Sequence, residues 1–428
     1  MLRHLGFLLW VAVSAMAITP NAWAELTVDI TQGAEGAMPI AVVPFQQPTL
    51  PGDTVSEIVA MDLHGTGKFS IMRESQLPER PIPPSTPDFP IWQTAGQEHV
   101  VIGRVVSGEG GGLVAEFVLY DAIRGVSELS ERVPFKPSDA RHAAHKIADM
   151  IYKQLTGDRG VFNTRVAYVA ASGYGNDREY RLVIADTDGE GDRVVMTSPE
   201  PIMSPNWSPD GKRLAYVSFE DHAAAVFVQS LSSGDRHKVS SLPGINGAPS
   251  WSPDGSELAV TLSKDGSPDI YVLDVNSGAM HRVTHDDSID TEASWSPDGR
   301  TLVFTSDRGG KPQLYTVSAH GGEAQRLTYD GSYNARGVFS PDGRSVAMVH
   351  GGQGGYKIAV MDLGSRHLRV LTSGRLDESP AFAPNGQMIL YTRKDGGLDQ
   401  LAVVSVDGKF KQNIRVKGGD IRGAAWSP

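Results

Sequence analysis

The chain has 428 residues and no cysteine, and its 50 Asp and Glu side chains outnumber its 39 Lys and Arg side chains. The length allows two or three domains with a sizeable core, and the lack of cysteine excludes disulfide scaffolds, thiolate zinc sites, iron–sulfur clusters and cysteine nucleophiles. Because the net charge of −11 repels phosphate groups, we expect no nucleic-acid partner.

Residues 1–24 have the pattern of a secretory signal peptide. Arg3 precedes an apolar run from Leu5 to Ala17, and Ala22-Trp-Ala24 places small residues where a signal peptidase cuts. The alternative is a membrane anchor, but the run is shorter than the roughly 20 residues that span a bilayer. We therefore predict cleavage between Ala24 and Glu25, export to a bacterial periplasm, and no direct insertion into the membrane.

The segment after this cleavage site alternates apolar and polar residues, so it can form an extended strand. On the residues alone, a strand in the sheet of the neighbouring domain is favoured. The alternative is a detachable arm that adds a strand to the sheet edge of a partner. The residues concerned are Glu25, Leu26, Thr27, Val28, Asp29 and Ile30.

Residues 25–160 predict a small mixed α/β domain. Ile40–Phe45 has the composition of a buried strand, and Thr54-Val-Ser-Glu57 has the spacing of a capping box for a helix that runs to about His64. Six prolines between Pro78 and Pro90 predict an extended loop.

The second half of this domain continues the mixed pattern. Two apolar segments, 100–106 and 113–120, predict a hairpin across an intervening glycine-rich turn. A second helix begins near Ser138, carries apolar residues at helical spacing, and ends at Gly157. We place the domain boundary at residue 160.

A repeat dominates the rest of the chain, residues 161–428. An aromatic residue followed by Ser-Pro-Asp-Gly, or by a close variant of that sequence, recurs at intervals of 44, 44, 44, 43 and 44 residues. Pro and Gly supply the backbone angles of a tight turn and Asp bonds to its own backbone, so the motif indicates a hairpin connection. The aromatic positions are Trp207, Trp251, Trp295, Phe339, Phe382 and Trp426.

Each repeat contains further short strands after the turn. In one unit these are Leu258–Leu262, Asp269–Asp274 and His281–Thr284. Together with the strand that carries the aromatic residue, they make four antiparallel strands. Four-stranded units with a period near 44 residues are typical of β-propeller blades. The 47 glycines and 27 prolines are therefore explained by turns and not by disorder.

The two ends of the repeat array complete one blade. Segments 165–170, 180–185 and 193–197 match the last three strands of a unit, and 421–426 supplies the missing first strand. This arrangement closes a ring of six blades and leaves no free inner edge. The predicted fold is thus a small N-terminal α/β domain followed by an all-β six-bladed propeller, with the aromatic residues wedged between blades as core.

Signatures of catalysis and metal binding are weak. No Gly-x-Ser-x-Gly occurs, so a propeller-containing serine peptidase or hydrolase stays only as the alternative to a binding protein. His142 and His145 lie three apart on a predicted helix and could contact one metal ion, but no His-Glu-x-x-His accompanies them, so exposed helical histidines are the favoured interpretation. Asp186–Asp192 resembles a calcium loop but lacks its distal Glu, and Gly351–Gly355 joins two strands. We expect no catalytic residue, metal or cofactor.

The geometry of the ring leaves one candidate site. Residues four or five positions before each aromatic residue lie at the same end of equivalent strands, so they are predicted to surround one mouth of the channel. Such a ring of loops can dock a protein or peptide, and the alternative is that these are simply solvated turns. The residues are Met203, Asn246, Thr291, Asn334 or Ala335, Glu378 and Ile421.

The chain resembles the TolB family of the periplasmic Tol-Pal system. The resemblance rests on the signal peptide, the small α/β domain, the repeated Trp-Ser-Pro-Asp-Gly and the terminal Ala425-Trp-Ser-Pro428. Four local strings add to it: residues 157–168, 201–211, 246–249 and 305–307. The resemblance covers essentially the whole mature chain.

The resemblance implies two protein partners. Proteins of this family bind the lipoprotein Pal at one propeller mouth and the C-terminal domain of TolA through the mature N-terminus, which favours the arm reading of residues 25–30. It also implies that the two sites are coupled, and that the system supports outer-membrane integrity and constriction during division. Ile245 departs from the pattern, since a histidine is expected there. The Pal-binding positions that the resemblance implies are Met203, Pro205, Asn246, Ala248, Thr291, Glu292, Arg336 and Glu378.

Overall fold

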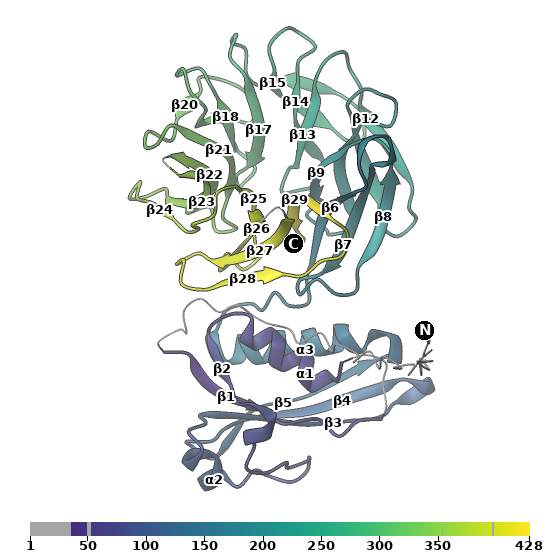
Figure 1. The fold of residues 1–428 in the computed structure, drawn as a ribbon, viewed down its shortest axis with the longest axis vertical. Coiled ribbons are helices and arrows are strands. Elements are labelled where there is room, and N and C mark those ends of the chain that lie inside the picture. The colour runs from purple at the N-terminus through teal and green to yellow at the C-terminus, as the bar shows by residue number, and fades with distance from the viewer. Residues whose placement is uncertain (1–35, 49–52, 353, 396–397) are drawn as a thin grey trace, which may run out of the picture.

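The computed structural model describes residues 36–48, 53–352, 354–395 and 398–428. The predicted signal peptide, its cleavage site at Ala24 and Glu25, and the segment Glu25–Ile30 lie outside these residues. The described chain forms two parts, a small α/β domain and a ring of six sheets above it (Figure 1).

The small domain is built on one mixed sheet with the strand order β2-β1-β3-β4-β5. The central strand β1 pairs in parallel with β2 and β3, whereas β3, β4 and β5 form an antiparallel meander. The predicted hairpin is therefore confirmed as β3 and β4. The strands are β1 (Met38–Val42), β2 (Phe69–Ile71), β3 (His99–Ser107), β4 (Leu113–Asp121) and β5 (Val126–Phe135).

Two helices of this domain have the ends that the sequence predicts. The Thr54 hydroxyl accepts the Glu57 backbone N–H at 3.2 Å, and the Glu57 carboxylate accepts the Thr54 N–H at 2.7 Å, which is the predicted capping box. It begins α1 (Val55–His64). The second helix, α3 (Ala140–Thr156), ends at Gly157, whose φ of 79° is left-handed.

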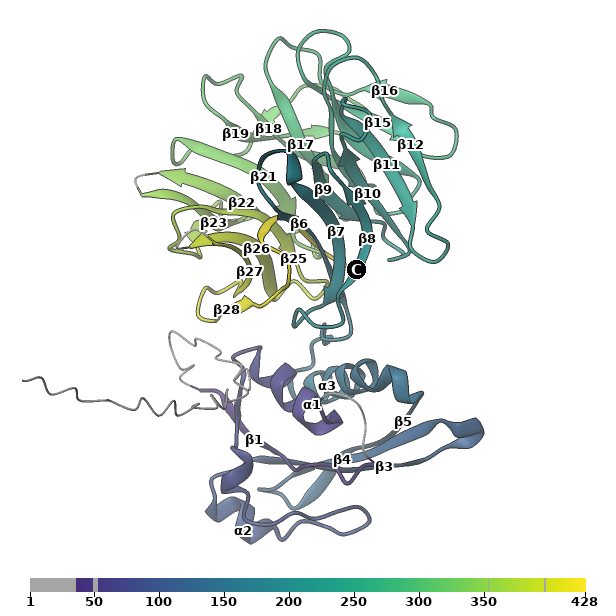
Figure 2. The same ribbon diagram turned by 45° about the vertical axis from the view of Figure 1, so that its right-hand side comes forward.

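The helices cover both faces of the sheet. α1 and α3 lie on the face toward the ring, where Ile58 and Ile147 are fully buried, and a short helix, α2 (Phe89–Thr94), buries Trp92 on the opposite face (Figure 2). Within the described ranges, no helix is long and apolar enough to cross a bilayer.

The repeats form six four-stranded antiparallel sheets, as the period predicts. Blade 2 consists of β9 (Ile202–Trp207), β10 (Arg213–Ser218), β11 (Ala225–Ser230) and β12 (Arg236–Ser240). Blade 3 consists of β13 (Asn246–Trp251), β14 (Glu257–Leu262), β15 (Asp269–Asp274) and β16 (Met280–Arg282). Blade 4 consists of β17 (Asp290–Trp295), β18 (Thr301–Ser306), β19 (Gln313–Ser318) and β20 (Gln325–Arg326). Blade 5 consists of β21 (Tyr333–Phe339), β22 (Ser345–Gly352), β23 (Gly355–Asp362) and β24 (Leu368–Val370). Blade 6 consists of β25 (Asp377–Phe382), β26 (Met388–Asp395), β27 (Leu398–Ser405) and β28 (Lys411–Ile414).

Blade 1 is shared between the two ends of the array, which confirms the predicted closure. Its sheet has the order β29-β6-β7-β8, and the last strand pairs antiparallel with the first, with Trp426 opposite Val166. The hydrogen bonds between β29 and β6 join the two ends of the ring. The strands are β6 (Arg165–Ser172), β7 (Glu179–Asp186), β8 (Arg193–Ser198) and β29 (Asp420–Trp426).

The repeated Ser-Pro-Asp-Gly sequence is a hairpin turn in every copy. In blade 3 the Ser252 hydroxyl donates to the Asp254 carboxylate at 2.6 Å and accepts the Glu257 backbone N–H at 2.9 Å. The φ of Gly255 is 71°, an angle that favours glycine. The motif therefore forms a structural turn, as the sequence predicts.

The aromatic residues in front of these turns pack between blades. Trp207, Trp251 and Trp295 are 5 to 8% exposed. The indole N–H of Trp207 donates to the Ala425 carbonyl at 3.3 Å and that of Trp295 donates to the Ser250 carbonyl at 3.0 Å, so these two rings reach the first strand of the preceding blade. Phe339 and Trp426 are only half-buried, so the wedge is less complete in those blades.

The small domain contacts the end of the ring that carries these turns, which we name the proximal face. Phe410, in the turn between β27 and β28, packs so closely on Gly67 that an added Cβ would lie 2.5 Å from its ring. The Asn385 side chain donates to the Arg159 carbonyl at 2.9 Å. The opposite end, where the first strand of each blade begins, is the distal mouth; the small domain does not reach it (Figures 1 and 2).

Candidate functional site: the distal mouth of the propeller

Every blade has a β-bulge in its first strand, three residues before the aromatic position. At each bulge the register with the second strand shifts and one residue takes a left-handed conformation, with φ between 46° and 59°. This conformation costs a non-glycine residue about 1 to 2 kcal/mol, yet five of the six blades place a non-glycine residue in it. The residues are Ser204, Ala248, Glu292, Arg336, Ser379 and Gly423.

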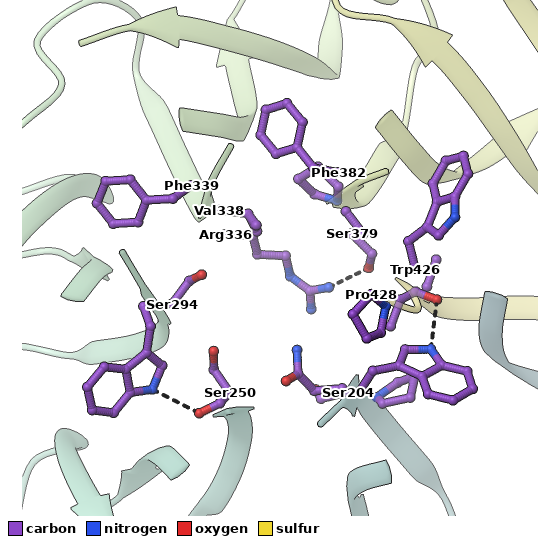
Figure 3. A pocket seen from close by; sticks show the side chains of 18 of the residues that line it. Ser204, Ser250, Ser294, Arg336, Val338, Phe339, Ser379, Phe382, Trp426 and Pro428 are labelled. Carbon is purple, nitrogen blue, oxygen red and sulfur yellow. Dashed lines mark hydrogen bonds between the residues drawn. The ribbon is translucent and has the colours of Figure 1, made fainter. Parts of the chain in front are cut away.

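These bulge residues line the axial channel. The channel contains a cavity of about 560 Å³, and the Arg336 side chain projects toward its centre (Figure 3). The Arg336 guanidinium donates to Glu292 at 2.7 Å and to the Ser379 hydroxyl at 2.6 Å. One arginine thus links blades 4, 5 and 6 across the channel, and the glutamate and serine hold it in place.

A second cavity, of about 400 Å³, opens at the rim between blades 6, 1 and 2. Met203 and Glu378 lie on its wall together with Arg336 and Arg422. The cavity therefore combines an apolar side chain with charges of both signs. Such a mixture suits a protein contact better than it suits a small apolar ligand.

Exposed apolar side chains gather around the same mouth. Met203 is 47% exposed, Ile245 48% and Ile289 52%, and all three lie in or just before the first strand of a blade. Tyr329, 70% exposed, is in the loop that leads into blade 5. Apolar groups rimmed by charged ones are typical of surfaces that bind other proteins.

The structure separates the predicted site residues into accessible and buried ones. Met203 and Glu378 are exposed, whereas Ala248, Thr291, Glu292 and Arg336 are half-buried at the channel wall. Thr291 contacts the Thr261 hydroxyl at 3.2 Å. These six residues lie at the distal mouth or the channel just inside it.

Asn246 and Pro205 are different, and here the prediction needs correction. Asn246 is 1% exposed; its side chain accepts from Ser240 at 2.6 Å and from the Leu242 backbone N–H at 2.9 Å. It holds the loop before β13 and does not present itself to a partner. Pro205 is also buried, in the channel wall.

The same correction applies to the wider ring expected at this mouth. Asn334, Ala335 and Ile421 are at most 3% exposed. Side chains alternate along a strand, and the bulge changes which residues face the channel. Counting back from the aromatic residue therefore finds the correct end of the strand but not the exposed side chains.

The helical histidines also differ from expectation. His142 is half-exposed, but His145 is 1% exposed and contacts the Asp62 carboxylate at 2.7 Å. Burial alone lowers the pKa of His145, but its interactions with Asp186 and Asp62 outweigh that effect and raise the pKa to about 10. Burial raises the pKa of Asp62 to about 6 despite its hydrogen bond to His145.

The loop that resembles a calcium site turns between β7 and β8, as predicted for a blade hairpin. Two of its carboxylates, Asp186 and Asp188, point toward Arg141 of the small domain and form ion pairs with it. The hairpin thus contributes to the contact between the two parts of the chain.

Comparisons with known proteins identify the family. Residues 26–127 match the TolB amino-terminal domain and residues 152–428 match the TolB beta propeller domain. The chain belongs to the TolB family. It is 62% identical over 98% of both chains to the Tol-Pal system protein TolB of Methylococcus capsulatus, and 58% identical over 95% of both chains to that of Thioalkalivibrio sulfidiphilus.

A solved structure supports the fold as well. The crystal structure of TolB from Acinetobacter baumannii superimposes with a TM-score of 0.87 at 40% identity and covers 94% of this chain and 100% of the other. The resemblance noted from the sequence is therefore confirmed, as is the six-bladed propeller with its small N-terminal domain.

Proposed function

We propose that the chain is a periplasmic adaptor of the Tol-Pal system, which binds the lipoprotein Pal at the distal mouth and TolA through its mature N-terminus. Its relatives are named Tol-Pal system proteins, so partner proteins within that system are its natural ligands. In this role it supports outer-membrane integrity and constriction during division.

The exposed apolar rim of the distal mouth is the observation that supports Pal binding most directly. Met203, Ile245 and Ile289 are each about half exposed there, although burying an apolar side chain is favourable by roughly 1.5 to 3 kcal/mol. The small domain occupies the other face and leaves this mouth accessible. A protein partner would bury these side chains.

Within this surface the residues have different roles. Met203, Glu378 and Ile245 have the exposure needed for direct contact. Glu292 and Arg336 are already paired at 2.7 Å, so they present a fixed pair of charges to the partner. Ile245 offers an apolar contact where a histidine was expected.

Capture of Pal tests this site. The mature chain should retain the purified periplasmic domain of Pal, and Glu378→Ala should weaken the complex because a rim charge is lost. Glu323→Ala is the matched control, since Glu323 is also exposed, in the turn between β19 and β20 on the proximal side. Equal affinity of the two variants would reject the assignment of the site.

For TolA binding, we propose the segment Glu25, Leu26, Thr27, Val28, Asp29 and Ile30. Its alternating pattern suits strand addition to a partner's sheet. Deleting it should abolish binding of the TolA C-terminal domain and leave the unfolding midpoint unchanged. A large drop in the midpoint would instead support the alternative, a strand of the chain's own sheet.

The hydrolase alternative has a direct test. A serine-reactive fluorophosphonate probe should not label the folded chain, because the Ser residues of the repeated turns are engaged with Asp side chains, as Ser208 is with Asp210 at 2.5 Å. Stoichiometric labelling would favour the enzyme over the adaptor.

A further inference from the structure

A buried cluster of charged residues lies where α3 meets blade 1. His145, on α3, is 1% exposed, and its Nδ1 atom is 2.7 Å from the Asp62 carboxylate of α1. Its other ring nitrogen, Nε2, faces the end of β7, where Oδ2 of Asp186 is 3.6 Å away and Oδ2 of Asp188 is 4.0 Å away. The histidine thus lies between the two parts of the chain.

The Nε2 atom of His145 is the group that points to a ligand. It is fully buried and has no hydrogen-bond partner among the described residues, and Asp186 at 3.6 Å is beyond hydrogen-bonding range. A buried polar atom without a partner is costly. A species bound between Nε2 and the two carboxylates would satisfy it.

The distances fit a metal ion. With metal–nitrogen and metal–oxygen bonds of about 2.0 to 2.2 Å, two ligand atoms on a tetrahedral ion lie about 3.4 Å apart. The observed 3.6 and 4.0 Å are close to that separation.

The contact between Nδ1 and Asp62 adds a second element of such a site. A histidine that ligates a metal through one nitrogen commonly donates its other N–H to a carboxylate, which fixes the ring and raises its basicity. Asp62, only 4% exposed at its side chain, holds His145 in that way. Nε2 then faces Asp186 and Asp188, and its lone pair is available to a metal ion that displaces the proton.

The charge balance favours a divalent cation. Three carboxylates, of Asp62, Asp186 and Asp188, surround the imidazole, and the Arg141 guanidinium pairs with Asp188 and lies 3.6 Å from Asp186. The raised pKa of His145 means that the ring carries a proton on Nε2 in the metal-free chain, which a metal ion would displace to leave a neutral imidazole. The sum is −2, and a divalent ion would bring it to zero. Asp53, which pairs with Arg141 at 3.5 Å, is largely exposed and screened by solvent.

We propose that His145, Asp186 and Asp188 bind a divalent transition-metal ion at the junction of the two domains, with Asp62 as the positioning residue. The nitrogen and oxygen donors suit Zn²⁺. The ligands come from both parts of the chain, so the ion would connect α3 to blade 1. A proton competes for Nε2, so binding weakens as the pH falls.

The test is a calorimetric titration of the chelator-stripped mature chain with zinc chloride at about pH 8, where a proton competes less for Nε2 than it does at lower pH. We expect one Zn²⁺ per chain, and Co²⁺ in its place should give the visible absorption of a tetrahedral site. His145→Gln should abolish binding. His142→Ala is the matched control, because His142 is on the same helix but outside the cluster, and it should bind as the unchanged chain does.

Two further variants keep the result interpretable. Asp188→Asn removes a ligand charge at a partly exposed position and should weaken binding even if His145→Gln does not fold. Asp62→Asn should weaken Zn²⁺ binding about 10- to 100-fold, the usual effect of losing an outer partner. Absence of zinc binding by the unchanged chain, or unchanged binding in folded His145→Gln or Asp188→Asn, would overturn the proposal.

Discussion

The two faces of the propeller use charged and apolar side chains in opposite ways. At the proximal face, Phe410 and His145 are buried between the two parts of the chain, and the carboxylates nearby are paired. At the distal mouth, Met203 and Ile245 remain about half exposed. The proximal face has the properties of a completed internal interface, and the distal mouth those of an interface whose partner is a separate molecule.

The comparison shows why one ring can combine rigidity with binding. Five of the six blades repeat the same turn at the proximal face, and the two ends of the ring meet there in blade 1, which gives the small domain a fixed surface to pack on. The distal bulges carry different side chains in each blade, from Gly423 to Arg336. The blades therefore differ from one another at the mouth where we propose that a partner binds.

The largest expected effect is at the proximal face. Phe410→Ala should lower the free energy of unfolding by about 3 to 5 kcal/mol, because it removes a buried ring and leaves a cavity. Denaturant-induced unfolding measures the change. Tyr329→Ala, at an exposed ring of the distal side, should change it by no more than about 0.5 kcal/mol. Similar losses in the two variants would contradict the contrast between the faces.

Substitutions at the bulges should change the free energy of unfolding by a smaller amount, and the sign of that change should depend on which residue is replaced. Gly423→Ala should destabilise the fold by about 1 to 2 kcal/mol, because alanine is strained in the left-handed conformation. The added Cβ would also approach Pro205 to 3.1 Å. Thermal unfolding at equal concentration is the measurement.

Ala248→Gly is the reciprocal variant. Glycine would relieve the backbone strain that alanine has at a φ of 46°. Because glycine also gives the unfolded chain more conformational entropy, which costs about 0.5 to 1 kcal/mol, the free energy of unfolding should stay equal or rise slightly. A clear loss of stability would show that the left-handed conformation at Ala248 is not strained.

At the rim of the distal mouth, a substitution should weaken binding without changing the stability of the fold. Met203→Ala should leave the free energy of unfolding within about 0.5 kcal/mol, yet weaken Pal binding by about tenfold if Met203 is a central contact. Met280→Ala, at an exposed methionine of β16 next to a proximal turn, should alter neither quantity. Calorimetry with the periplasmic domain of Pal gives both affinities.

The smallest effect concerns the proximal turns. The Ser252 hydroxyl holds the pKa of Asp254 below its ordinary value. A carboxylate with a lowered pKa stabilises the fold above its unfolded pKa, and this contribution is lost as the pH falls through the folded pKa. Ser252→Ala should raise the pKa of Asp254 in an NMR titration and leave that of Asp298, in the next blade, unchanged.

Much of the fold could be predicted from the sequence because it depends on local chemistry. The turns at Ser-Pro-Asp-Gly, the capping box at Thr54 and the left-handed Gly157 are each set by residues within a few positions. The interval of 44 residues then fixes the number of blades, and the incomplete units at the two ends require closure through β29.

The candidate site could be located from the sequence but not resolved into contacts. Equivalent strand positions identify the distal mouth. Asn246 and Met203 occupy neighbouring positions of the repeat, yet Asn246 is 1% exposed and Met203 is 47% exposed. The bulges have no local sequence pattern, since serine, alanine, glutamate, arginine and glycine all occupy them.

The sequence by itself determined the blades, their turns and the closure of the ring, because hydrogen bonding and backbone angles within a repeat depend on nearby residues. Only the tertiary structure decided which side chains are buried and which are exposed, because burial depends on what other segments bring. His145 shows this most clearly: it looks like an exposed helical residue until Asp62 and Asp186, from two distant segments, enclose it.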